Sequence, residues 1–302
     1  MRFAYSAESD LGHVRDNNED AAFAAPHLLV VADGVGGQAA GEVASATVAS
    51  VMSTISLRAI TSPGDPVDLL VVLRQTIERA LHTLSDGVDA DQARAGMATT
   101  MTAILTDGTR FALAHVGDSR AYLLRAGELT QLTTDHTYVQ VLLDKGSITP
   151  EEAKVHPHRS VVTRYVNATD RHEPQLTMLD LREGDRLLLC SDGLTDFISD
   201  ERLGADLGGM PADGAAESPP TAATSPDEAG GSPKKVGGSP DNAVERLISS
   251  GLAAGGRDNI TCVVADVEAH DLDLENRPTA RRIGALADPE NVIDLATAER
   301  AG

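Results

Sequence analysis

The stretch TMTAILTDGTRFALAHVGDSRAYLLRAGELTQL, residues 100–132, decides the fold class. Apolar runs over 100–107 and 110–118 are separated by a turn signal, and their content of Leu, Ile, Val and Ala predicts buried strands. Residues 120–132 predict a hairpin that turns at Ala126-Gly127-Glu128. Strands joined by turns this short pair antiparallel.

The rest of the chain continues this pattern. Further strands are predicted over 28–33, 185–193 and 259–267. Helical spacing of small and apolar residues occurs over 39–57 and 66–84, the second with an acidic start at Asp68. Many strands with few long helices predict an α+β fold with antiparallel sheets rather than repeated βαβ units.

Composition and charge exclude several classes of protein. The chain has 302 residues, 41% of them hydrophobic, and a formal net charge of −21. This balance excludes nucleic acid as a partner, because a phosphate backbone requires Lys and Arg. If a chain this acidic binds phosphate, bound metal ions are the obvious source of positive charge.

The chain also lacks the sequence signals of export. No run of about 18 apolar residues predicts a membrane span, and the first residues lack a signal-peptide pattern. Cys190 and Cys262 lie in apolar runs, which predicts buried thiols in a reducing compartment. We therefore expect a cytoplasmic protein.

Two segments depart from the globular pattern. Residues 204–240 are rich in Pro, Gly, Ser, Ala and Thr, which predicts a disordered insertion with Lys234 and Lys235 as solvated linker residues. Residues 269–302 are predicted to form a flexible acidic tail. The folded domain is therefore predicted to span residues 1–268.

Acidic residues recur at the predicted strand ends: four Asp residues are each expected to end an apolar strand, and two further acidic residues stand before the first one. An Asp at a strand end is usually only a turn residue, but several of them can point to one edge of a sandwich. The residues in question are Glu19, Asp20, Asp33, Asp118, Asp192 and Asp258. If these side chains converge, their mutual repulsion decides the chemistry of the site.

The repulsion is large enough to require cations. Two unit charges about 4 Å apart interact by roughly 4 kcal/mol at an effective dielectric constant of about 20. Several such pairs exceed the roughly 5–15 kcal/mol that stabilises a domain. An all-oxygen ligand set favours Mg²⁺ or Mn²⁺ over Zn²⁺. Two ions sharing one carboxylate would activate a bridging water, which suits hydrolysis of a phosphate ester.

Arg15 stands four residues before Glu19. A lone Arg is usually a solvated surface residue. Beside a metal site, however, a guanidinium is suited to hold two phosphate oxygens at once. Arg15 is therefore a candidate substrate-binding residue.

A dinucleotide site is the rival interpretation. GVGGQA, residues 34–39, matches the fingerprint G-x-G-x-x-G/A. No acidic residue closes a second strand about 20 residues later, and Asp33 would lie beside the pyrophosphate. These two features disfavour the dinucleotide interpretation. His156 and His158 are interpreted as surface or capping histidines and are left out of the site.

An ordered set of motifs resembles the metal-dependent protein phosphatase family (PPM, type 2C), in particular its bacterial members that act with Hanks-type kinases. The resemblance covers about residues 3–267. It implies an αββα sandwich of two antiparallel β-sheets flanked by α-helices. The motifs are RDNNED (15–20), ADGVGG (32–37), MATTMTA (97–103), HVGDSRAYLLRAGELTQLT (115–133), LCSDGLTD (189–196) and GGRDNITCVVADV (255–267).

The resemblance also implies a role for each site residue. Asp33 bridges two metal ions, and the carbonyl of Gly34 helps to hold one of them. Asp192 and Asp258 hold the first ion, and Glu19 belongs to the shell of the second. Asp20 supports the site, Asn259 lies outside the direct ligands, and Asp118 joins Asp192 at a third, weaker ion. Arg15 grips the phosphate, and residues 136–181 form a flap beside the site.

Two positions depart from the family pattern. Val35 stands where many eukaryotic members have a histidine proposed as general acid, so the leaving group must be protonated by metal-bound water or another group. Ala98-Thr99-Thr100 replaces the usual Gly-Thr-Thr, which adds one methyl group.

The function implied by the resemblance is a serine/threonine protein phosphatase that uses two Mn²⁺ or Mg²⁺ ions, with a third as an option. Its partners would be phosphorylated proteins, including serine/threonine kinases, and we expect a monomer. One alternative is a phosphatase of anti-sigma-factor antagonists. Another is a catalytically dead regulatory module, which would require the loss of metal ligands, whereas every expected acidic position is filled.

Overall fold

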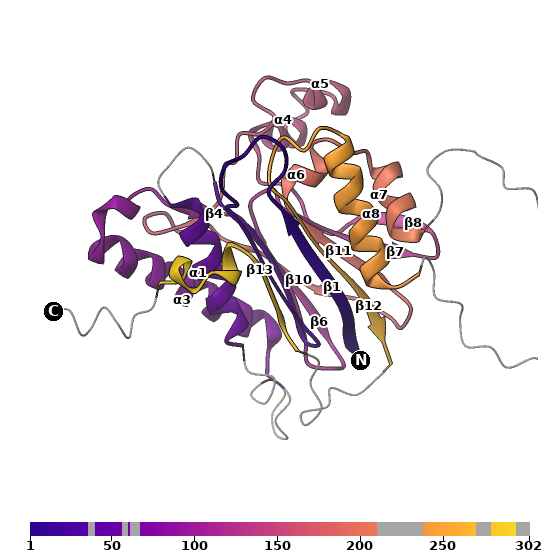
Figure 1. Cartoon of the computed structure of the whole chain (residues 1–302), viewed down its shortest axis with the longest axis horizontal. Helices are drawn as coiled ribbons and strands as arrows, with labels where there is room; N and C mark the ends of the chain where they lie inside the picture. Colours follow the sequence, from indigo (N-terminus) through magenta and orange to yellow (C-terminus); the bar gives the residue numbers. More distant parts are fainter. Residues whose placement is uncertain (36–39, 56–59, 61–66, 210–237, 270–278, 294–302) are drawn as a thin grey trace, which may run out of the picture.

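The computed structural model describes residues 1–35, 40–55, 60, 67–209, 238–269 and 279–293 (Figure 1). Two large sheets, one five-stranded and one six-stranded, pack between layers of helices. All paired strands in both sheets are antiparallel. The predicted α+β fold, an αββα sandwich, is confirmed.

The five-stranded sheet contains the predicted hairpin. Its strand order is β1 (Arg2–Asp10), β12 (Ile260–Glu268), β11 (Arg186–Cys190), β7 (Arg120–Arg125) and β8 (Glu128–Gln131). The turn between β7 and β8 places Ala126 and Gly127 at φ of 52° and 85°. A left-handed backbone at this turn favours glycine, which explains the position of Gly127.

The six-stranded sheet contains the first predicted strand and the first half of the opening stretch. Its order is β10 (Gln175–Leu179), β6 (Phe111–Val116), β5 (Met101–Thr106), β3 (Leu28–Asp33), β2 (Asp20–Ala25) and β13 (Arg281–Gly284). A separate short pair joins β4 (Ala98–Thr99) to β9 (Val166–Asn167). The flap predicted over 136–181 is thus partly wrong, because β10 belongs to the main sheet.

Both faces of the central strands are buried, which explains their continuous apolar sequence. In β3, Leu29 and Val31 pack between the two sheets. Leu28 and Val30, on the opposite face, pack against the helices of the outer layer. Side chains of a strand alternate between its two faces, so only a strand covered on both sides needs an unbroken apolar run.

Helices cover the outer face of each sheet. Helices α1 (Gly41–Ser53) and α3 (Leu69–Ala90) pack on the six-stranded sheet. Helices α6 (Asp192–Thr195), α7 (Asp200–Gly208) and α8 (Pro240–Ala253) lie against the five-stranded sheet. Helices α4 (Tyr138–Asp144) and α5 (Pro150–Lys154) lie at one end of the sandwich, above α6 (Figure 1). In the described part of the chain, no helix is long and apolar enough to cross a membrane.

Helix boundaries differ from the sequence predictions. The helix predicted over 66–84 begins at Leu69, because the Asp68 side chain accepts a hydrogen bond from the Leu70 N–H, and it continues to Ala90. The helix predicted over 39–57 runs from Gly41 to Ser53. Cys190 and Cys262 are buried free thiols, as predicted.

The predicted insertion over 204–240 is too long at both ends. Residues 204–208 complete α7, and α8 begins at Pro240 after the N-cap Ser239, whose hydroxyl accepts from the Asn242 N–H. Residues 210–237, including Lys234 and Lys235, lie outside the described residues.

The prediction of a flexible tail over 269–302 is wrong for its middle part. Residues 281–284 form β13 at the edge of β2, and the short helices η2 (Ala285–Ala287) and η3 (Pro289–Asn291) follow. Hydrogen bonds with a neighbouring strand and a few buried side chains such as Leu286 order this segment without a long apolar pattern.

Candidate metal centre

A pocket of about 640 Å³ brings together almost all of the predicted site residues. Asp20 alone of the predicted residues does not line it. The predicted residues in its wall are Arg15, Glu19, Asp33, Gly34, Asp118, Asp192, Asp258 and Asn259. Val35 and Thr100 also line it, as do Ser160 and Val162 of the predicted flap.

Asp33 ends β3, and the neighbouring threonines hold its backbone. Its N–H donates to the Thr100 hydroxyl at 3.0 Å. Its carbonyl accepts from the Thr99 hydroxyl at 2.8 Å and from the Thr100 N–H at 2.8 Å. Both threonines belong to the motif MATTMTA, residues 97–103, but the motif alone did not predict a role for them. They fix the direction in which the Asp33 carboxylate leaves the strand.

Glu19 is held from three sides. Its N–H donates to the Asn259 side chain at 2.8 Å, and its carbonyl accepts from the Gly34 N–H at 3.1 Å and the Ser45 hydroxyl at 2.5 Å. A Cβ at Gly41 would lie 2.9 Å from the Glu19 carboxyl carbon. Only glycine permits the start of α1 to approach the Glu19 carboxylate this closely.

Asn259 ties its own loop to the loop between β1 and β2 at three points. In addition to Glu19, its side-chain amide donates to the carbonyls of Leu11 and Asn17, each at 3.0 Å. Its hydrogen-bonding capacity is thus directed at the protein backbone. This arrangement fits a residue that orders the pocket and does not depend on metal contact.

Asp258 and Arg15 are partners. The Arg15 guanidinium donates to the Asp258 carboxylate at 2.7 Å, and both side chains line the pocket. Hydrogen bonding to Asp258 raises the pKa of Arg15, so it carries its positive charge at any physiological pH. Asp258 lies two residues before β12, which corrects the expectation that it ends a strand.

Asp20 lies behind the pocket wall. It is 1% exposed, and its carboxylate accepts from the Ser191 hydroxyl at 2.7 Å. Ser191 in turn accepts from the Thr261 N–H at 3.0 Å. Burial raises the pKa of Asp20 to about 6 despite these hydrogen bonds. The predicted supporting role fits this position, whereas a direct metal contact does not.

The carboxylates destabilise one another's charge. Burial, together with Asp20, Asp192 and Asp118, raises the pKa of Asp33 well above its usual range. Burial and Asp118 act in the same direction on the pKa of Asp192. Burial raises the pKa of Glu19 as well. Arg15 is the only basic residue among the described residues that line the pocket.

The residues fit a site for hard divalent cations. The donors are carboxylate and carbonyl oxygens, which Mg²⁺ and Mn²⁺ prefer. The excess of negative charge in one small pocket is the property that bound cations relieve. Within the described residues, no three side chains of His, Cys, Asp or Glu form a preformed ligand set around one point. The fit therefore rests on the chemistry of the donors and their shared pocket.

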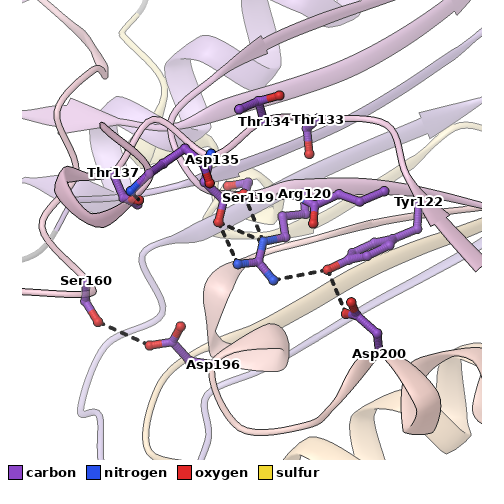
Figure 2. A network of polar contacts seen from close by, with 12 residues as sticks. Ser119, Arg120, Tyr122, Thr133, Thr134, Asp135, Thr137, Ser160, Asp196 and Asp200 are labelled. Carbon is purple, nitrogen blue, oxygen red and sulfur yellow. Dashed lines mark hydrogen bonds and ion pairs between the residues drawn. The ribbon is translucent and has the colours of Figure 1, made fainter. Parts of the chain in front are cut away.

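A second pocket of about 570 Å³ adjoins the first, and Asp118 and Asp192 line both. Figure 2 shows its polar network, in which the Arg120 guanidinium binds Asp135 through two nitrogens and also donates to the Tyr122 hydroxyl. On the opposite side, the Ser160 hydroxyl donates to Asp196 at 3.2 Å (Figure 2). Burial, Asp135 and Asp196 raise the pKa of Asp118 to about 7. Sequence reasoning did not find these contacts.

The remaining sequence expectations concern Val35 and two histidines. Val35 lines the pocket, so no imidazole is available at this position. His156 and His158 line neither pocket and instead form ring contacts with Tyr138 and with each other. Residues 36–39 of the glycine-rich GVGGQA segment lie outside the described residues.

Comparison with known proteins defines the class. Residues 13–213 match the family model described as protein phosphatase 2C. The serine/threonine protein phosphatase PstP of Mycobacterium tuberculosis is 44% identical over 267 residues, 88% of this chain and 45% of that protein. Protein phosphatase PhpP of Streptococcus pneumoniae is 33% identical over 65% of this chain and 80% of its own length. The chain thus spans under half the length of PstP.

Solved structures agree with the sequence comparison. The crystal structure of the PstP/Ppp phosphatase of M. tuberculosis superimposes with a TM-score of 0.73 at 42% identity, covering 89% of this chain and all of that one. The PstP catalytic domain in complex with two manganese ions gives a TM-score of 0.70 at 40% identity over 88% of this chain and 99% of that one. This chain belongs to the protein phosphatase 2C family.

Proposed function

We propose that this protein hydrolyses phosphoserine and phosphothreonine in proteins by metal-assisted attack of water. The observation that carries this proposal is one pocket lined by Glu19, Asp33, Asp118, Asp192 and Asp258. Among the lining residues that the structure describes, Arg15 is the one basic side chain. A carboxylate pocket of this kind suits divalent cations, and a guanidinium at its rim suits a phosphate dianion. The relative PstP, which is named a serine/threonine protein phosphatase, supports the substrate class.

The metal-holding residues follow from the donor set. Asp33 and the Gly34 carbonyl, with Glu19, Asp192 and Asp258, would hold two Mn²⁺ or Mg²⁺ ions, and Asp118 with Asp192 a third. Bound ions of this type lower the pKa of water and stabilise negative charge on a phosphoryl group. The PstP catalytic domain solved with two manganese ions supports this assignment. Asp20 would act behind the ligands through Ser191.

The remaining side chains of the pocket would bind the phosphate group or orient the metal-holding residues. Arg15 is paired with Asp258, and both side chains line the pocket. When a phosphate group enters the pocket, the Arg15 guanidinium would exchange Asp258 for the phosphate oxygens. Thr100 and Asn259 hold the backbones of Asp33 and Glu19. Val35 cannot donate a proton. The serine or threonine oxygen that leaves the phosphate must therefore receive its proton from an oxygen acid in the pocket or from solvent.

The cellular setting is proposed from the relatives. Phosphorylated proteins, among them serine/threonine kinases, are the expected partners. The protein is expected to act as a monomer in the cytoplasm.

A phosphopeptide assay tests the proposal. Purified protein should hydrolyse phosphothreonine and phosphoserine peptides in the presence of Mn²⁺ and lose this activity in excess chelator. A phosphotyrosine peptide of the same sequence serves as the matched control. Turnover of phosphotyrosine alone, or turnover that is unchanged by chelator, would contradict the proposal.

A further inference from the structure

The C-terminal segment 281–293, here called the C-terminal strap, packs on the start of β2, behind the wall of the metal centre. Its strand β13 pairs with β2 so that Gly284 is opposite Ala21, the residue after Asp20. Figure 1 shows the strap beside α1. Its strand β13 is the edge strand of the six-stranded sheet, next to β2. The strap is close in space to the first site motif although about 260 residues separate them in the sequence.

Gly284 is the point of closest approach. Its φ is 64° and its ψ is −142°, a region that essentially only glycine occupies. A Cβ at this position would lie 3.0 Å from the Asp20 carbonyl carbon, closer still to the carbonyl oxygen, and 3.2 Å from the Ser9 hydroxyl. The backbone at Gly284 therefore packs directly on the Asp20 peptide.

The groups under Gly284 are joined by hydrogen bonds to the turn that carries Glu19. The Ser9 hydroxyl accepts from the Asn18 side chain at 2.8 Å and shares a hydrogen bond with the Thr261 hydroxyl at 2.6 Å. Asn18 in turn accepts from the Asp20 N–H at 3.1 Å. These contacts fix the turn 18–20, which contains Glu19. A displacement of the backbone at Gly284 is therefore expected to shift the Glu19 side chain through this turn.

The strap also contacts α1, the second support of Glu19. The Ile293 N–H donates to the Thr47 hydroxyl of α1 at 3.1 Å. Leu286 is 2% exposed and belongs to the core that α1 shares with the six-stranded sheet. Two residues before Thr47, Ser45 of the same helix donates to the Glu19 carbonyl. The strap thus bears on both elements that hold Glu19.

We propose that the C-terminal strap positions the turn 18–20 of the metal centre, with Gly284 as the positioning residue. The inference rests on the proposed function, because it concerns the geometry of the metal-holding side chains. Groups that orient metal ligands from outside typically contribute about 10–100-fold to metal affinity. Gly284→Ala in the full chain is therefore expected to weaken Mn²⁺ binding by about 10-fold or more.

The test is calorimetric titration of the metal-free full-length chain with Mn²⁺, which does not depend on activity. Gly127→Ala is the matched control for backbone strain, since Gly127 also has a left-handed φ, of +85°, with nothing within 4 Å of the added Cβ. Gly284→Ala should raise the dissociation constant for Mn²⁺ while Gly127→Ala leaves it unchanged. Equal affinity in both variants would overturn the role of the strap.

A second pair of variants covers the case in which Gly284→Ala does not fold. Leu286→Ala loosens the strap, and Leu207→Ala removes an equally buried leucine from the core under α7 and α8. Both should lower the melting temperature, but only Leu286→Ala should weaken Mn²⁺ binding. Unchanged affinity in Leu286→Ala would overturn the inference and leave the proposed function intact. A wild-type chain that binds no Mn²⁺ would overturn both.

Discussion

Carboxylates that the fold withdraws from bulk water are arranged in two opposite ways in this molecule. At the far side of the five-stranded sheet, Asp266 receives two hydrogen bonds from Arg186, at 2.6 and 3.0 Å, in an ion pair that is almost fully buried. In the pocket, Asp33 and Asp192 have other carboxylates as neighbours, which raise their pKa values. The first arrangement neutralises its charge within the fold, whereas the second requires a cation from outside. The candidate functional site is the group of carboxylates whose negative charge the protein does not neutralise with its own side chains.

The largest expected effect follows from removing a carboxylate of the pocket. Asp33→Asn or Asp192→Asn should reduce phosphopeptide turnover by roughly three orders of magnitude or more, because each removes a proposed ligand of the ions that activate water. In chelator, neither variant should unfold at a lower temperature than the wild type, since the change relieves repulsion. Measurements of turnover and of the melting temperature on the same variants check both the loss of activity and the unchanged stability. Near-normal turnover would refute the metal assignment.

Breaking the neutralised pair should affect stability instead. Arg186→Met leaves Asp266 as a buried charge and removes the donor to the carbonyls of Leu207 and Gly238, at 2.8 and 2.7 Å. Loss of one partner from a buried pair costs about 3–5 kcal/mol in free energy of unfolding. Urea denaturation measures this loss. Arg182→Met, which breaks an exposed pair with Asp180, is the control and should leave the free energy of unfolding almost unchanged.

Added metal should stabilise the wild-type protein through the pocket. Mn²⁺ at about 100 times its dissociation constant should add roughly 2.7 kcal/mol to the free energy of unfolding, because it binds the folded state. The gain should disappear in Asp33→Asn and persist in Arg182→Met. Differential scanning fluorimetry over a Mn²⁺ series checks this. An equal shift in Asp33→Asn would place the bound ion elsewhere.

A smaller effect concerns a buried group that stays uncharged. Burial, with His136 close by, lowers the pKa of His115 to about 3, while the side chain contacts the Thr102 hydroxyl at 2.9 Å. An unfolded histidine has a pKa of about 6.5. The folded pKa lies below this value, so stability is fully present above pH 6.5 and is lost as the pH falls from about 6.5 toward 3. At pH 5 the loss is about 2 kcal/mol.

The variant His115→Gln provides the comparison for this pH dependence. Glutamine retains hydrogen-bonding groups but does not titrate in this range. Its free energy of unfolding should fall less than that of the wild type between pH 7 and 5. Parallel urea titrations at both pH values measure the difference. Identical pH slopes would show that His115 does not carry the effect.

The sequence predicted the strands best where burial on both faces imposes a continuous apolar run. The strand over 28–33 was predicted to the residue, and the hairpin over 120–132 has its turn at the predicted position. Strands β1, β2 and β13 were not predicted. Each contains several polar or small residues. Strands β1 and β13 pair with strands distant in the chain, whereas β2 lies between β13 and its neighbour in sequence, β3.

The sequence by itself determined the fold class, the family and the residue types of the candidate site. Apolar runs and motifs consist of residues that are neighbours in the chain, so they can be recognised without the structure. Only the tertiary structure decided how those residues meet. It placed Asp20 behind the pocket, paired Arg15 with Asp258 and brought Gly284 onto the Asp20 peptide. The physical reason is that such contacts join residues up to about 260 positions apart, and no local pattern encodes their approach.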